Sequence, residues 1–112
     1  MDITFQSQKM AKEFNEQKLL VRRYGSQRAT LIRRRLDELR AAETLEVMRS
    51  LPRARCHELH QNLAGKLAVN LDQPYRLIFE PDHDPVPTKA DGGLDWTGVT
   101  AIRILSVEDY HE

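Results

Sequence analysis

The chain has 112 residues, of which 40% are hydrophobic and 30% are charged. This length suits one ordinary domain with a single core and is too short for two, so we expect one domain over residues 1–112. The composition excludes a disordered chain, and no apolar run approaches the roughly 20 residues that cross a bilayer. The first residues lack the features of a signal peptide, and the lone Cys56 cannot form an internal disulfide. We therefore expect a cytoplasmic location, with Cys56 as a small core residue.

The formal net charge of zero hides two halves of opposite charge. Residues 1–60 contain 13 Lys and Arg against 8 Asp and Glu, whereas residues 61–112 contain 4 against 9. The arginine-rich first half could present a basic face to phosphate or to an acidic partner. The alternative is an ordinary solvated helix surface, on which the arginines pair with neighbouring carboxylates. The charge pattern leaves both interpretations open.

The first half of the chain has helical periodicity. Residues 7–24 predict one helix or two short ones, which Gly25 would end as a C-cap. Ser26 is then the expected N-cap of a longer helix over residues 27–42, where leucines and isoleucine recur at helical spacing without glycine or proline. Before these helices, the alternation in residues 3–5 predicts a short edge strand.

A last helical turn or two is expected over residues 44–50, and it should end before Pro52 because proline disfavours helix at the preceding residue. Beyond Pro52 the apolar residues alternate, which predicts three antiparallel strands. The strands fall at residues 66–71, 75–79 and 100–105. Residues 80–98 contain four Asp, three Pro and three Gly and predict a long acidic loop. Helices followed by strands indicate an α+β domain, with an N-terminal helical hairpin packed on one face of an antiparallel sheet.

Several side chains that transfer protons or bind anions fall at the ends of the predicted strands. Two histidines precede the first strand, an arginine lies near the start of the second, and a carboxylate, a phenol and an imidazole follow the third. These residues are His57, His60, Arg76, Asp109, Tyr110 and His111. All could border one sheet face, and together they suit cleavage of an RNA phosphodiester by its own 2′-hydroxyl without a metal. That reaction needs a base, a cation for the charge on phosphorus and an acid for the leaving oxygen.

Each of these residues also has an ordinary structural interpretation. Arg76 would equally fit a solvent-facing sheet arginine paired with a carboxylate, and Tyr110 could cover the sheet edge. His57 and His60 without a third ligand do not predict a zinc site, and we expect no metal and no cofactor. Trp96 could simply anchor the long loop. Composition and periodicity therefore leave the function open.

Five segments carry a recognisable pattern: LEVMRSLP at 45–52, CHEL at 56–59, GKLAV at 65–69, PYRLIF at 74–79 and VEDYH at 107–111. Their order and spacing resemble HigB-type toxins of the RelE/ParE superfamily, from about residue 27 to the end. The resemblance implies a helical hairpin against a curved antiparallel sheet. It also implies a bacterial toxin that cleaves mRNA in the ribosomal A site, with a HigA-type helix-turn-helix antitoxin as its inhibitor and co-repressor.

The resemblance also assigns roles to residues. His57 looks like the family's catalytic histidine, Arg76 like its phosphate-binding arginine, and Asp109, Tyr110 and His111 like its C-terminal active-site residues. His57 or His111 would act as general base or acid, because an imidazole titrates near neutral pH. Asp109 would orient an imidazole or a base, and Tyr110 would stack on the RNA or hydrogen-bond to it.

Two further residues complete the expected site as substrate contacts: Lys66, and His60, which stands where several relatives carry a lysine. The loop at 80–98 is longer than in the minimal toxins of the family, and its acidic residues would repel ribosomal RNA. We therefore expect it to lie away from the RNA-binding face.

Two other functions remain open at this stage. A ParE-like inhibitor of DNA gyrase would use the same scaffold as a binding module, and a catalytically inactive relative would act only through its antitoxin complex. The clustered proton donors favour the nuclease, since a pure binding module has no need of them. The sequence lacks a helix-turn-helix pattern, so we do not expect sequence-specific DNA binding.

Overall fold

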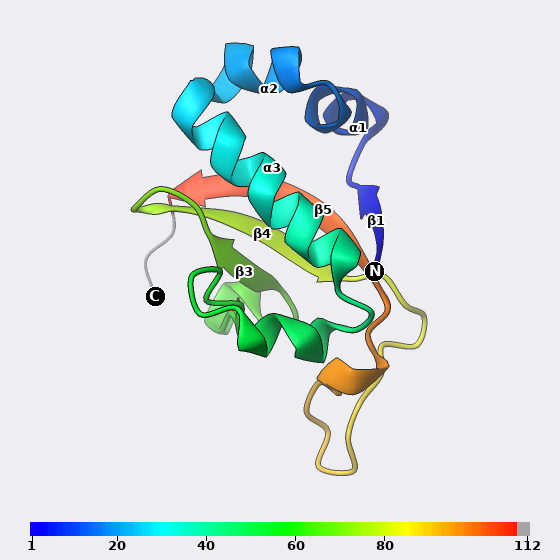
Figure 1. Ribbon diagram of the computed structural model, residues 1–112. Coiled ribbons are helices and arrows are strands. Elements are labelled where there is room, and N and C mark those ends of the chain that lie inside the picture. The colour runs from blue at the N-terminus through cyan, green and yellow to red at the C-terminus, as the bar shows by residue number, and fades with distance from the viewer. Residues whose placement is uncertain (110–112) are drawn as a thin grey trace.

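The computed structural model describes residues 1–109, which form a five-stranded sheet with α3 crossing one of its faces (Figure 1). The strands are β1 (Asp2–Phe5), β2 (His57–Glu58), β3 (Leu67–Asn70), β4 (Tyr75–Pro81) and β5 (Ala101–Asp109). The α-helices are α1 (Gln8–Asn15), α2 (Gln17–Tyr24) and α3 (Ser26–Ala41), and the 3₁₀ helices are η1 (Leu45–Ser50), η2 (Gln61–Leu63) and η3 (Trp96–Gly98). Within residues 1–109, no helix combines the length and the apolar character needed to cross a membrane.

The strand order in the sheet is β1-β5-β4-β3-β2. The three strands predicted from alternation are β3, β4 and β5, and they pair antiparallel as expected. The expectation of a purely antiparallel sheet is wrong at one edge, because β1 runs parallel to β5, with Asp2 opposite Ala101 and Phe5 opposite Ile104. A parallel pair needs a long connection, and here nearly the whole chain lies between the two strands. The sheet is therefore mixed.

The helices of the first half form as predicted, except that the N-cap of α3 lies one residue earlier than expected. Residues 7–24 form two short helices that meet at Glu16, and the Ser7 side chain caps α1 by accepting from Met10 N at 3.1 Å. Gly25 ends α2 as predicted, with φ at 82°. The prediction of Ser26 as the next N-cap is wrong, because the carbonyl of Gly25 already accepts from Ala29 N at 3.0 Å. Gly25 thus ends one helix and caps the next.

The core lies between α3 and the sheet. Ile32, Leu36 and Leu39 of α3 are completely buried, as the helical spacing predicts. They belong to one apolar cluster with side chains from four strands, including Leu77 and Phe79 of β4. The predicted turn over residues 44–50 is the 3₁₀ helix η1, which ends before Pro52 as expected. At about 1.5–3 kcal/mol for each fully buried large apolar side chain, this cluster stabilises the packing of α3 on the sheet.

The arginines of α3 divide into buried and exposed side chains. Arg35 is only 5% exposed, so the interpretation of all these arginines as surface residues is wrong for this one. Its Nε donates to Asn70 O at 2.7 Å, Nη2 donates to Arg53 O at 3.2 Å, and Nη1 pairs with Glu38 at 2.9 Å. A buried charge persists only with such partners. Arg35 therefore ties α3 to β3 and to the segment before β2.

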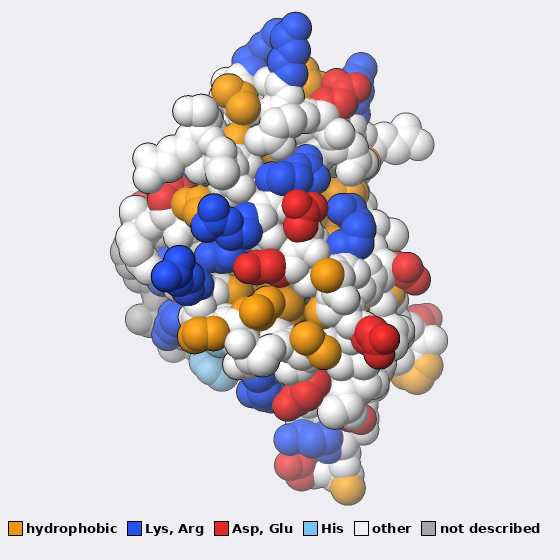
Figure 2. Space-filling view, in the orientation of Figure 1, with side chains coloured by type: hydrophobic (Ala, Val, Ile, Leu, Met, Phe, Trp, Pro, Cys, Tyr) orange, Lys and Arg blue, Asp and Glu red, His pale blue; other side chains and the backbone are white. Residues whose placement is uncertain are grey.

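On the surface around α3, neither charge dominates. Figure 2 shows Lys and Arg side chains interspersed with Asp and Glu around an apolar area, and Val47 of η1 is 45% exposed. Arg49 pairs with Glu46 at 2.9 Å within the same element. This distribution favours the interpretation of a solvated, mixed surface over that of a uniformly basic face.

The segment between β4 and β5 covers residues 82–100, two positions later than the predicted loop, because β4 continues through Pro81; it contains the 3₁₀ helix η3 at residues 96–98. An isolated bridge between Thr88 and Leu94 closes a turn within it. Figure 1 shows this segment at the end of the sheet where β4 finishes and β5 begins, opposite to the end where β5 reaches Asp109.

Candidate active site

One face of the sheet faces α3, and the other, which we call the open face, carries most of the predicted site. Along β4, Leu77 and Phe79 belong to the main core, so alternation turns Arg76, Ile78 and Glu80 to the open face. A small second apolar cluster covers part of this face, where Leu59 and Leu63 pack over Ala68 and Ile78. The open face is therefore partly covered and partly accessible.

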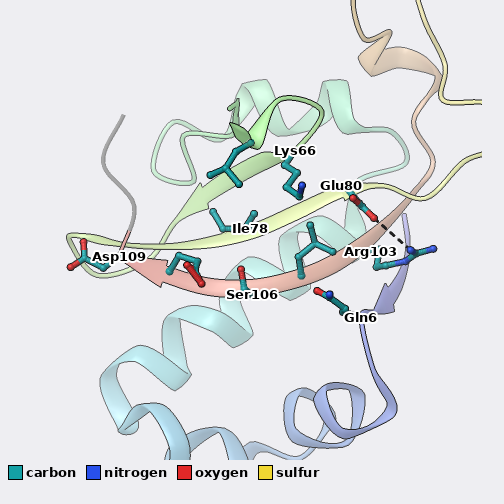
Figure 3. Close-up of a pocket in the computed structure, with 10 residues that line it drawn as sticks. Gln6, Lys66, Ile78, Glu80, Arg103, Ser106 and Asp109 are labelled. Carbon is teal, nitrogen blue, oxygen red and sulfur yellow. Dashed lines mark ion pairs between the residues drawn. The ribbon is translucent and has the colours of Figure 1, made fainter. Parts of the chain in front are cut away.

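A groove of about 490 Å³ runs along the open face. Its lining residues are Gln6, Leu63, Lys66, Ile78, Glu80, Arg103, Leu105, Ser106, Glu108 and Asp109. A β-bulge leaves Leu105 as an extra residue between the pairs Ile78–Ser106 and Phe79–Ile104, so Leu105 and Ser106 both line the groove. Figure 3 shows Asp109 at one end of the groove and the ion pair between Glu80 and Arg103 at the other.

His57 lies on the same face as the groove. In β2 it stands opposite Ala68, whose side chain belongs to the open-face cluster. Its Nδ1 is 2.8 Å from Arg55 O. Because a carbonyl oxygen only accepts, Nδ1 carries the proton in the neutral ring, and Nε2 is the basic nitrogen. His60 follows as the exposed N-cap residue of η2, so the two histidines belong to different elements.

Strand β2 has only two residues and is fixed by side chains as well as by pairing with β3. Glu58 accepts a hydrogen bond from Trp96 Nε1 at 3.0 Å, and the guanidinium of Arg49 lies 3.8 Å from the centre of the Trp96 ring. Trp96 is 4% exposed. Trp96 therefore anchors the long loop, in agreement with its structural interpretation from the sequence. No sequence pattern indicates that Trp96 also holds the residue next to His57.

Arg76 stands between Asn70 of β3 and Glu108 of β5 in the sheet register. Its Nη1 donates to the side chain of Gln73 at 3.3 Å and to the carbonyls of Pro74 and Tyr75 at 3.2 Å. The guanidinium thus lies against the turn before β4 and not in the groove lining. Next to it, Asn70 Oδ1 is buried without a hydrogen-bond partner among residues 1–109.

The turn that precedes Arg76 is held from the helix side. Arg28 of α3 donates from Nε to Asp72 at 3.0 Å, and its guanidinium lies 3.5 Å from the centre of the Tyr75 ring. The hydrogen bond from Arg28 holds the pKa of Asp72 below its usual value. This contact fixes the position of the strand start that presents Arg76.

The described residues bring together part of the predicted site. Lys66 and Asp109 line the groove, Asp109 standing opposite Tyr75 at the end of β5. Tyr110 and His111 lie outside the described residues. Within residues 1–109, no three His, Cys, Asp or Glu side chains gather in a way that could hold a metal ion. Burial raises the pKa of the Cys56 thiol to about 12, and Cys56 packs against the core, which agrees with its predicted structural role.

The fold is similar to that of a chain in a solved complex. A chain of the structure described as "YoeB-YefM complex from Staphylococcus aureus" matches with a TM-score of 0.54, over 100% of this chain and 98% of that chain. Identity is 17%, so this likeness concerns the fold alone. It confirms the predicted α+β fold, apart from the parallel edge strand.

A comparison of the sequence with protein-family models identifies the family. A model described as "RelE-like toxin of type II toxin-antitoxin system HigB" matches residues 4–88, and the chain belongs to this family. None of the curated proteins matches the chain. The family match includes His57, His60, Lys66 and Arg76 but ends before β5.

Proposed function

We propose that this toxin is a ribosome-dependent mRNA endoribonuclease, formed by one domain over residues 1–112, and that it cleaves RNA without a metal on its open face. The observation that supports this most is the placement of His57 and Arg76 on the face whose groove is lined by Lys66 and Asp109. His57 and Arg76 thus share one face of the sheet with a groove that an ammonium and a carboxylate line.

In the proposed reaction, the 2′-oxygen attacks the adjacent phosphorus and the bond to the 5′-oxygen breaks. One imidazole, His57 through Nε2 or His111, takes the proton of the 2′-hydroxyl, and a second group returns a proton to the leaving 5′-oxygen. The products are a 2′,3′-cyclic phosphate and a 5′-hydroxyl, so no water or metal is consumed. Imidazoles suit both steps because they titrate near neutral pH.

Arg76 would stabilise the charge that develops on the phosphate oxygens. Its present acceptors, around the turn at residues 73–75, are neutral and lie 3.2–3.3 Å away. A phosphate would replace them with shorter, charge-assisted hydrogen bonds to a planar fork. The guanidinium of Arg76 therefore has to leave its acceptors at residues 73–75 when RNA binds.

The remaining site residues would hold the RNA. Lys66, in the groove wall, would attract a neighbouring phosphate, and His60 could donate to one beside it. Asp109 would orient an imidazole or a nucleobase, and Tyr110 would stack on a base or hydrogen-bond to it.

The partners follow from the family and from the neighbouring structure. A helix-turn-helix antitoxin of the HigA type would bind this toxin and inhibit it, as the toxin–antitoxin composition of the YoeB-YefM complex suggests. Its other partners would be mRNA and the ribosome in the cytoplasm. We propose no sequence-specific DNA binding by this chain.

The proposal is tested by inducing the toxin in bacteria without its antitoxin. We expect growth arrest and new mRNA ends within translated codons. His57→Ala, Arg76→Ala and His111→Ala should each relieve the arrest while circular dichroism reports an intact fold. Arg34→Ala, which removes an exposed arginine of α3, is the matched control and should stay toxic.

Other outcomes would contradict the proposal. Full toxicity of the Arg76 and His111 variants would show that the site is wrongly assigned. Supercoiling defects with intact mRNA would favour a ParE-like gyrase inhibitor. A wild-type protein that neither cuts mRNA nor arrests growth would be a catalytically inactive relative that acts only in its antitoxin complex.

A further inference from the structure

The end of the groove farthest from Asp109 is built differently from the catalytic end. Glu80 of β4 and Arg103 of β5 stand opposite each other in the sheet and pair at 3.5 Å, and Gln6 lies beside them (Figure 3). Arg103 also pairs with Asp82 at 2.9 Å, and Asp82 in turn accepts from Thr4 Oγ1 at 2.9 Å. This network joins β1, β4 and β5, so it holds the Glu80 carboxylate in place before any ligand arrives.

At this end Arg103 faces two carboxylates, those of Glu80 and Asp82. A phosphate would gain little there, because phosphate binding depends on excess positive charge. Half-buried Leu105 lines the groove and offers an apolar surface to a flat ring, and Ile78 beside it is buried. Fixed polar groups beside an apolar surface suit an unstacked nucleobase.

We propose that this end of the groove binds a guanine base of the RNA, with the Glu80 carboxylate accepting from guanine N1–H and N2–H. This inference rests on the proposed nuclease function. A carboxylate has two acceptor oxygens and binds two parallel donors best. Of the four RNA bases, only guanine presents two adjacent N–H donors on its Watson–Crick edge. Gln6, which lines the same part of the groove, would donate from its side-chain amide to guanine O6.

The subsite is separate from the bond that is cut. Arg103 and Asp109 are six positions apart on β5, which corresponds to about 20 Å along a strand. The base bound by Glu80 is therefore a neighbour along the RNA, and its identity sets which sequences are cut. Glu80 is a specificity residue and takes no part in the proton transfers.

Guanine and inosine allow a direct test, because inosine lacks only the N2 amino group. Purified toxin is mixed with ribosomes carrying mRNAs in which guanine or inosine occupies one position at a time around the A-site codon. We expect the wild type to cut the guanine mRNA about tenfold faster at one position. Glu80→Gln, whose amide offers a single acceptor, should cut both mRNAs at similar rates. Glu46→Gln, which alters another Arg-paired carboxylate outside the groove, should retain the difference.

Each result bears on the inference. Equal rates for guanine and inosine at every position in the wild type would overturn it, without any need for a variant. A preference that survives in a folded Glu80→Gln protein would overturn the role of Glu80. Cleavage without base preference refutes the inference alone and leaves the nuclease standing, whereas no cleavage by the wild type refutes both.

Discussion

The two faces of the sheet are built from the same strands, but one face packs in the core and the other carries the candidate site. Along β4, Leu77 and Phe79 are completely buried against the helices, whereas Arg76 and Glu80 are half-buried on the open face. Alternation lets neighbouring residues contribute to stability and to chemistry independently. Substitutions on one face should therefore change folding, and substitutions on the other should change activity.

Charged residues follow the same division. On the helix side, Arg35 and the Arg28–Asp72 pair connect α3 to β3 and to the turn after it. On the open face, Lys66 and Asp109 line a groove that a ligand can enter. The first group is structural because it connects elements of the chain to each other, whereas the second group lines the groove of the open face.

The sharpest test of this division is Phe79→Ala. The side chain is completely buried in the main core, so its loss removes contacts and leaves a cavity. We expect the free energy of unfolding to fall by about 3–5 kcal/mol. Chemical denaturation measures this loss directly. Ser106→Ala, on the open face, should stay within about 0.5 kcal/mol of the wild type, and similar losses for the two variants would break the comparison.

A smaller effect is expected from Trp96→Phe, which keeps a ring but removes the donor to Glu58. The free energy of unfolding should fall by about 1 kcal/mol. Cleavage should slow as well, because strand β2, which carries His57, loses a side-chain anchor. Glu58→Gln retains an acceptor oxygen and should have the milder effect of the two. A Trp96→Phe protein with unchanged stability and unchanged cleavage would show that the loop does not hold β2.

The smallest effect is expected at Asp72 and depends on pH. Its folded-state pKa lies below the usual value of 3.8, so its contribution is fully present above that value and is lost as the pH falls through the folded-state pKa. Asp72→Asn should therefore lower the free energy of unfolding at pH 7 by no more than about 1 kcal/mol. Below the folded-state pKa the variant and the wild type should converge. Asp37→Asn, an exposed control on α3, should give no such pattern.

Much of the fold is predictable from local pattern. The spacing of Ile32, Leu36 and Leu39 predicts α3, and alternation predicts β3, β4 and β5. The direction of β1 is not predictable in this way, because a four-residue strand carries no mark of whether its neighbour is parallel or antiparallel. The burial of Arg35 also escapes local pattern, since its acceptors, Asn70 O and Arg53 O, are distant in sequence.

The candidate site was predictable where chemistry and strand position coincide. Tyr75 and Leu77 are apolar and pack on the core side, so the alternation of the strand places Arg76 between them on the open face. Glu80 and Arg103 escaped prediction because their proximity depends on the register of β4 against β5 and on the bulge between them. The link from Trp96 to Glu58 likewise depends on how a long loop folds back, which no local pattern specifies.

If the open face cuts RNA as proposed, the cut ends must carry the chemical groups that this reaction leaves. Purified toxin, ribosomes and a short mRNA are mixed, and the termini of the fragments are identified by mass spectrometry. We expect a 2′,3′-cyclic phosphate and a 5′-hydroxyl within the A-site codon, lost in Arg76→Ala and retained in Arg34→Ala. An uncut mRNA with the wild type, or undiminished cutting by Arg76→Ala, would contradict the proposal.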